Sequence, residues 1–446
     1  MLNKLKALNN NNNVINLLFA AIPFSFIAGN LVLNLNTLLI IIISFIIFKK
    51  KIFSFNYDLL DKIIIIFFSY ICLISLFNYF INYNGNQQLM DIMILKKSFF
   101  YLRFLFLYFV IRYLIRENII NLKIFFFSAS ICSLFVCLDL VYQFTYGFDI
   151  FGYKAVSRRL SGPFGDELVA GSYLQRFSIF LIFIIPLFYK IKDKKLLFLI
   201  FFLLIGLILF SLIIAGNRMP LILFIVIIIS ILILEKGLRK FIIPFILVFF
   251  IITMTIFNNN SKHVFNKTSE YKSHFKQINK KVSEFVVFFS GKIDRSGKGE
   301  IVVINGKQMQ INNVYVKEFN AGYQTWLENK FIGDGVKSFK KNCQIANVKN
   351  CGAHPHNYYL EILADLGLVG FVLIFSSFSV LVYRSFIKKY FLDSSLRYNH
   401  IITPFIFLFL AEIFPIRTTG SFFSTANATY FFLVMAITIA LSKKET

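Results

Sequence analysis

Charged residues are scarce in this sequence, and acidic residues are the scarcest. Asp and Glu supply 22 of the 446 residues, against 47 Lys and Arg, whereas hydrophobic residues reach 57%. The apolar residues come in uninterrupted blocks that are far too long for the strands or helices of a soluble domain. The composition therefore excludes a soluble globular protein and predicts a polytopic membrane protein.

The shortage of acidic residues leaves a formal net charge of +25. A nucleic-acid partner would need these basic residues in one patch or stripe. They are instead scattered through short segments between the apolar blocks, which excludes nucleic acid as the expected partner. Membrane topology explains most of the charge.

Each apolar block is close to the ~20 residues that a helix needs to cross a bilayer. We expect no cleavable signal peptide, because Asn9 to Asn13 follow only two lysines and no small-residue cleavage site closes the first block. The fold class is predicted to be all-α and polytopic, with about twelve transmembrane helices at roughly 14–30, 31–48, 62–81, 98–115, 124–145, 172–189, 196–214, 219–234, 241–257, 357–383, 400–416 and 422–441.

The basic residues fall in every second loop, and cytoplasmic loops carry an excess of Lys and Arg. This alternation predicts that both termini are cytoplasmic. The opposite, external loops hold few cations, and a cation so close to hydrocarbon is costly unless it is paired, reaches the surface or faces a wet cavity. Arg218 lies in a tight turn. Its side chain either extends to the membrane surface or belongs to a functional site. The external cations are chiefly Lys96, Lys97, Lys154, Arg158, Arg159, Arg218 and Arg417.

One long polar stretch interrupts the helices. We divide the chain into residues 1–257, which hold the first nine helices, an external segment at residues 258–356, and residues 357–446, which hold the last three. A β-hairpin is predicted at 300–311, because Asn305-Gly306 is a favoured two-residue turn. The segment is rich in lysine, which suits an anionic ligand or a merely solvated loop.

Cysteine and histidine are also scarce, with five of each. Cys343 and Cys351 lie in the external segment, where an oxidising compartment would allow a disulfide. The alternative is zinc binding by this pair with His354 and His356, although the spacing matches no closed zinc pattern. The other three cysteines fall in predicted helices and are interpreted as packing residues.

His354 and His356 lie in one tripeptide, where the external segment enters the tenth predicted helix. An imidazole there can take or give a proton near neutral pH, which is useful at a reaction centre. The alternative is structural: Asn357 or His356 caps the helix, and Gly367 and Gly370 allow neighbouring helices to approach.

The motif His356-Asn357, nine residues, then Gly367-Leu368-Val369-Gly370 resembles the signature of the O-antigen ligase and polymerase superfamily. Members are membrane glycosyltransferases that act on polyprenyl-diphosphate-linked glycans. Gly216-Asn217-Arg218 is similar to an external arginine motif of the family. So is the segment from Arg159 to Asp166, and Trp326 with Gly333-Asp334-Gly335 and Phe339 is similar to the segment before the histidine. The resemblance covers about 155–375.

The resemblance implies that His356 is the general base that takes a proton from an acceptor hydroxyl. Arg159 and Arg218 would clamp the departing diphosphate. Arg158, His354 and Asn357 are further candidates for substrate binding. No metal or other cofactor is expected, because arginines can neutralise the diphosphate and no external Asp-x-Asp pair is present. A single attack on the anomeric carbon would invert its configuration.

The expected function is therefore that of an O-antigen or surface polysaccharide polymerase in the bacterial inner membrane, active on the periplasmic face. Its expected partners are a polyprenyl-diphosphate-linked glycan donor, a glycan acceptor and membrane lipid, and a chain-length regulator protein is a candidate partner. One alternative is a ligase that transfers glycan to lipid A core or protein. Another is a lipid-linked oligosaccharide flippase or transporter. Transporters often place their site near the bilayer midplane between two related halves, whereas the polar residues of this chain are concentrated in one late segment predicted to be external.

Overall fold

The protein is described by a computed structural model over residues 12–54, 56–81, 88–155, 159–189, 193–235, 239, 251, 301–304, 307–310, 314–348, 351–392, 395–418 and 420–443. The regular structure in these residues is helical apart from one two-stranded sheet. This agrees with the predicted all-α class.

Eight helical segments in the described residues are long and apolar enough to cross a membrane. The helices that form them are α3 (Asn30–Phe48), α4 (Leu59–Ile81), α5 (Gln88–Tyr101) running into α6 (Arg103–Arg116), α7 (Leu122–Tyr146), α8 (Ala170–Phe188), α9 (Lys194–Ile214), α15 (Tyr358–Val382) and α18 (Thr425–Ser442).

Three shorter apolar helices also coincide with predicted spans. They are Asn12–Ile27, which ends in α2 (Ile22–Ile27), α10 (Arg218–Leu234) and α17 (Thr403–Glu412). The predicted span at 241–257 lies outside the described residues apart from Ile251. The total of about twelve helices therefore stays a prediction.

Short polar side chains set several helix starts. The side chain of Asn121 accepts from the Lys123 backbone N–H ahead of α7, and Asp193 accepts from the Lys195 N–H ahead of α9. Such caps satisfy backbone donors that have no partner within the helix. Gly147 follows the last residue of α7 and caps it, with a φ of +87°, the left-handed conformation typical of a helix terminus.

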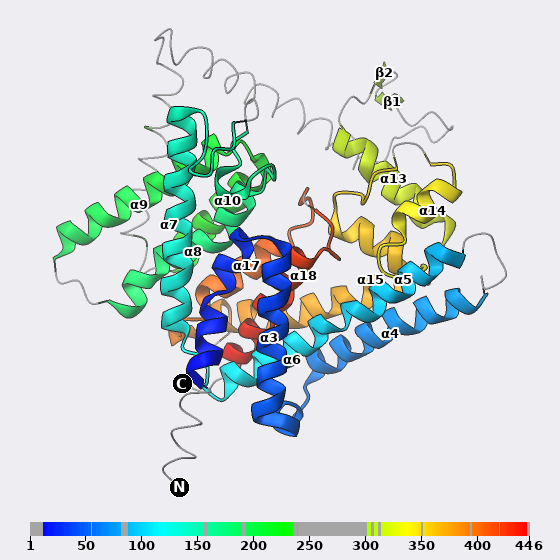
Figure 1. Ribbon diagram of the computed structural model, residues 1–446, viewed down its shortest axis with the longest axis horizontal. Coiled ribbons are helices and arrows are strands. Elements are labelled where there is room, and N and C mark those ends of the chain that lie inside the picture. The colour runs from blue at the N-terminus through cyan, green and yellow to red at the C-terminus, as the bar shows by residue number, and fades with distance from the viewer. Residues whose placement is uncertain are drawn as a thin grey trace.

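α18 forms the centre of the helix bundle (Figure 1). Its residues from Ala428 to Leu441 are buried, and it packs against α3, α6 and α17. By contrast, α3 and α4 expose large apolar side chains such as Leu31 and Leu73. An outward apolar face is what contact with lipid requires, because hydrocarbon does not solvate polar groups.

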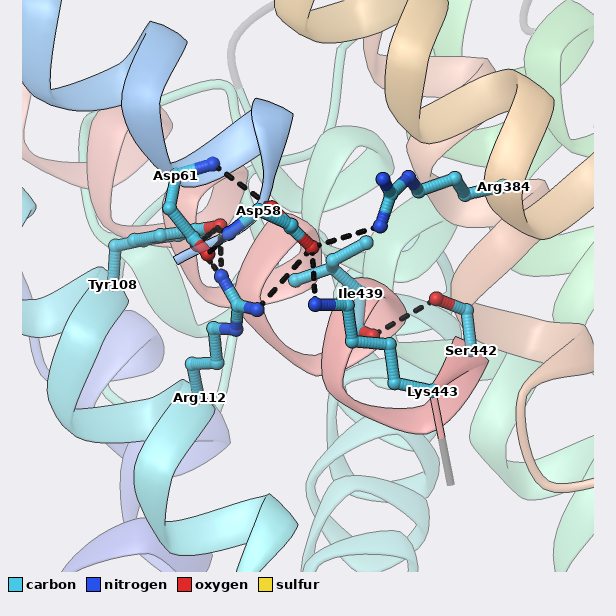
Figure 2. A network of polar contacts seen from close by, with 8 residues as sticks. All are labelled: Asp58, Asp61, Tyr108, Arg112, Arg384, Ile439, Ser442 and Lys443. Carbon is cyan, nitrogen blue, oxygen red and sulfur yellow. Dashed lines mark hydrogen bonds and ion pairs between the residues drawn. The ribbon is translucent and has the colours of Figure 1, made fainter. Parts of the chain in front are cut away.

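A polar network ties four helices together at one end of the bundle (Figure 2). Asp58 lies before α4, and its Oδ2 is 3.3 Å from Arg112 Nη2 and 3.0 Å from Arg384 Nη1. The same oxygen is 2.5 Å from Lys443 Nζ. Arg112 lies near the predicted cytoplasmic end of the span 98–115, and Arg384 and Lys443 directly follow the predicted spans 357–383 and 422–441. Their contact agrees with the predicted topology, and the side of the membrane stays a prediction.

The described part of the segment predicted to be external lies at one end of α4, α5 and α15 (Figure 1). Strand β1 (Ile301–Ile304) pairs antiparallel with β2 (Lys307–Gln310), with Ile304 opposite Lys307. This pairing confirms the predicted hairpin, whose turn residues Asn305 and Gly306 lie outside the described residues. α13 (Val314–Glu328) and α14 (Phe339–Ile345) follow. Short helical turns elsewhere are Lys49–Phe53, Gly162–Phe164, Tyr383–Ile387, α16 (Lys388–Tyr390) and Ser395–Tyr398.

Candidate active site

A cavity of about 1370 Å³ lies among the loops predicted to be external. Three residues singled out from the sequence line it: Arg159 before α8, Arg218 at the start of α10, and His356 before α15. These residues come from distant parts of the chain. The fold thus brings the predicted base and both predicted clamp residues to one cavity.

The cavity wall is strongly basic. Among the described residues that line it, there is one carboxylate, that of Glu167, against five basic side chains. Cations that share a cavity with few acids attract and hold an anionic ligand. The basic lining residues are Arg159, Arg176, Arg218, Lys337 and Arg417.

Two of these arginines share one buried carboxylate. Arg176 Nε and Nη2 donate to the two oxygens of Glu412, at 2.9 and 3.1 Å, and Arg417 Nη1 lies 2.8 Å from Glu412 Oε1. Arg176 also donates to Asn427 Oδ1 at 2.8 Å. Because one negative charge offsets two positive charges, this wall keeps an excess of positive charge. The bonds also hold both guanidinium groups in place.

His356 has an uncommon backbone conformation, with a φ of +52°. Few residues other than glycine adopt positive φ, and such residues cluster at functional sites. Its Nε2 lies 3.5 Å from Glu318 Oε1 of α13, and its ring centroid is 4.2 Å from that of His354. Burial raises the pKa of Glu318, and the nearby His356 partly offsets this shift. The Tyr315 ring meets His356 edge-on at 5.8 Å.

Asn357 caps α15 from the position next to His356. Its Oδ1 accepts from the backbone N–H groups of Tyr359 and Leu360, at 3.0 and 3.2 Å, and its Nδ2 donates to the Pro415 carbonyl at 2.8 Å. Asn357 is 5% exposed and is not among the residues that line the cavity. The structure therefore gives it the capping role that the sequence left open, and this role holds the start of α15 where His356 faces the cavity.

α15 is broken at Gly367, where φ is +66° and ψ is −169°. Residues 330–335, here called the insert loop, lie in the break. The backbone N–H groups of Leu368 and Val369 donate to the carbonyls of Lys330 and Phe331, at 2.9 and 3.0 Å. A Cβ on Gly367 would lie 2.4 Å from the Phe331 carbonyl. The glycine is therefore needed for close backbone approach.

The carboxylate of Asp365, beside this break, holds the start of α14. It accepts from the backbone N–H groups of Lys337 and Phe339, at 2.8 and 2.6 Å, and from Ser338 Oγ at 3.2 Å. Carboxylates at helix starts satisfy free N–H groups and complement the helix dipole. The insert loop, α14 and α15 thus form one unit that places Lys337 in the cavity wall.

Cys343 and Cys351 form a disulfide, with their Cα atoms 5.8 Å apart. It links α14 to the loop that leads to the histidines. Oxidised sulfur atoms cannot act as thiolate ligands, so this bond leaves no place for the zinc alternative. Among the described residues, no group of three or more His, Cys, Asp or Glu side chains could hold a metal ion.

His354, a predicted binding residue, does not line the cavity, and its ring lies tilted beside that of His356. Arg158 lies outside the described residues, so its role stays a prediction.

Sequence reasoning missed Glu318, Arg176 and Glu412. Arg176 and Glu412 lie within predicted helices, and a charge inside an apolar span is itself a sign of function or pairing. That signal could have identified both. Glu318 carries no comparable signal, because it is one of several acids in a polar segment.

Comparison with known families connects this geometry to a class. Residues 202–375 match the family model described as O-antigen ligase. This range includes Arg218, Glu318 and His356 but not Arg159, Arg176 or Arg417. No curated protein matches the chain. Ligases and polymerases of this kind are glycosyltransferase-like enzymes, which supports an enzymatic role in the membrane. The match over residues 202–375 confirms the predicted likeness to the O-antigen ligase and polymerase superfamily.

Proposed function

We propose that this chain is a membrane glycosyltransferase of the polymerase type. It transfers a polyprenyl-diphosphate-linked glycan to a hydroxyl of an acceptor glycan. The observation that carries the proposal is the convergence of His356, Arg159 and Arg218 on one cavity. The family match supports the class of enzyme, and the choice of a polymerase over a ligase is our own inference.

The walls of the cavity suit both ends of such a donor. Apolar residues, among them Phe26, Leu33, Met219 and Ile222, line it beside the basic ones. Of these, Ile222 on α10 is 41% exposed, which leaves apolar surface available for contact with a lipid chain. An isoprenoid chain requires apolar contacts, and a diphosphate requires cations.

In the proposed reaction, His356 takes the proton of the acceptor hydroxyl as the acceptor oxygen bonds to the anomeric carbon. The bond from that carbon to the phosphate oxygen breaks, and its electron pair leaves with the diphosphate. Arg159 and Arg218 stabilise the developing charge, since guanidinium groups grip phosphate oxygens bidentately. One displacement inverts the anomeric configuration.

The proposed setting follows from the same residues. The cavity is lined by loops predicted to be external, which would place the reaction on the periplasmic face of the bacterial inner membrane. The expected partners remain the lipid-linked donor, the glycan acceptor and a chain-length regulator. A purified assay with lipid-linked repeat units or lipid A core as the acceptor separates polymerase from ligase.

The test compares His356→Ala with His354→Ala in a deletion strain, at matched expression. We expect His356→Ala to lower transfer by ~10²–10⁴-fold, the contribution of general base catalysis, with donor binding largely retained. His354→Ala should have a milder effect, because His354 does not line the cavity. Normal glycan chain length from His356→Ala would reject the assignment of the base.

A further inference from the structure

Glu318 belongs to a face of α13 that packs against the histidine tripeptide. Tyr315, Glu318 and Gly322 recur at intervals of three and four residues, which places them on one side of a helix. A Cβ on Gly322 would lie 2.7 Å from the Cβ of Pro355, between the two histidines. This close approach brings the Glu318 carboxylate to His356.

The His356 imidazole lies between the cavity and the Glu318 carboxylate. His356 lines the cavity, whereas Glu318 does not. Glu318 Oε1 lies 3.5 Å from His356 Nε2, and Glu318 Oε2 is buried with no hydrogen-bond partner among the described residues. Hydrogen bonds at catalytic groups are often long without substrate and shorten in the reacting complex. The carboxylate therefore has the imidazole beside it and does not itself line the cavity.

We propose that Glu318 is the positioning residue of His356, an inference that rests on the proposed function. Its carboxylate accepts a hydrogen bond from the Nε2–H group, which keeps that proton on Nε2. The lone pair of the neutral ring therefore lies on Nδ1. Nδ1 then takes the proton of the acceptor hydroxyl, and the carboxylate stabilises the imidazolium that forms. This is the division of labour between a base and the carboxylate that orients it. The imidazolium releases the proton to water after the diphosphate has left.

Two other rings lie beside His356. The ring of His354 is tilted by 43° to it, and Tyr315 meets it edge-on. The cations that line the cavity with His356, among them Lys337, Arg159 and Arg218, are hydrogen-bond donors only and cannot accept a hydrogen bond from its ring. The Glu318 carboxylate is an acceptor 3.5 Å from His356 Nε2.

The first experiment is a double-mutant cycle in the purified full-length protein, with polyprenyl-diphosphate-linked glycan as the donor. Glu318→Ala should lower kcat on the order of tenfold, a part of the ~10²–10⁴-fold that a general base contributes, with KM for the donor unchanged. In the His356→Ala background, Glu318→Ala should cause no further loss. Glu328→Ala, an exposed acid on the same helix, is the matched control and should leave kcat unchanged.

An equal loss in both backgrounds, or a change in KM alone, would overturn the proposal, because either result indicates a structural role. Glu318→Gln keeps the shape and an acceptor oxygen but removes the charge. It should fold like the original chain and retain more activity than Glu318→Ala. If the Gln variant were as impaired as the Ala variant, the hydrogen bond from His356 Nε2–H to residue 318 would have no role in transfer, and the proposal would be refuted.

The second experiment needs no turnover. Imidazole ¹⁵N resonances of the histidine-labelled protein, assigned through His356→Ala, should show one neutral tautomer for His356, with the proton on Nε2. Glu318→Ala should give a mixture of tautomers, and Glu318→Gln should keep the single one. An unchanged tautomer in Glu318→Ala would overturn the proposal. A chain that shows this tautomer but transfers no glycan would refute the proposed function and leave the contact established.

Discussion

The break in α15 makes a quantitative prediction for Gly367→Ala. Gly367 has φ +66° and ψ −169°, a region open almost only to glycine, and holding another residue there costs ~1–3 kcal/mol. The new Cβ would also lie 2.4 Å from the Phe331 carbonyl, which is backbone and cannot rotate away. The insert loop must then shift, and its bonds from Leu368 and Val369 are at risk.

Each of these two bonds contributes about 0.5–1.5 kcal/mol. We therefore expect Gly367→Ala to lower the free energy of unfolding by ~2–6 kcal/mol in all. The chain has a single tryptophan, Trp326, whose indole N–H donates to the Lys330 carbonyl in the insert loop at 3.0 Å. Denaturant unfolding in detergent can be followed by Trp326 fluorescence, and the emission of the folded variant should itself change.

Gly29→Ala is the matched control. Gly29 has φ +100° and ψ 174°, in the same glycine region, but a Cβ there would meet nothing within 4 Å. Both variants are destabilised by holding alanine in a backbone conformation that favours glycine. Only Gly367→Ala also loses the two hydrogen bonds to the insert loop, which contribute about 1–3 kcal/mol to the free energy of unfolding. Equal destabilisation of the two variants, with unchanged Trp326 emission, would refute the account of the broken helix.

Three further predictions concern the cavity, the disulfide and the topology. Arg159→Ala and Arg218→Ala should weaken both donor binding and turnover, and Lys should replace either arginine poorly because it lacks the planar fork; full activity of the Lys variants in a transfer assay would contradict the clamp. Replacing Cys343 and Cys351 by Ser should lower the free energy of unfolding by about 2–3 kcal/mol on the chain-entropy estimate, and two free thiols in non-reducing mass mapping would exclude the bond. Reporters fused to both ends of the chain should report the cytoplasm and one in the external segment should report the outside, so an external C-terminus would reject the topology.

The membrane helices could be predicted from the sequence because their cause is local. A run of about twenty apolar residues must leave water whatever the rest of the chain does. The short polar turns between the runs are local as well, which is why Arg218 and His356 could be placed at helix ends before the fold was known.

Only the tertiary structure decided which distant groups meet. Glu318 reaches His356 because Gly322 lets α13 pack on Pro355, and no pattern within the polar segment encodes that approach. Glu412 lies between Arg176 and Arg417 for a similar reason, since charges buried in an apolar bundle must pair with whichever side chains the helix packing presents. The periodicity of α15 likewise predicts one continuous helix. Its break at Gly367 depends on hydrogen bonds to the insert loop, which replace those that the helix loses.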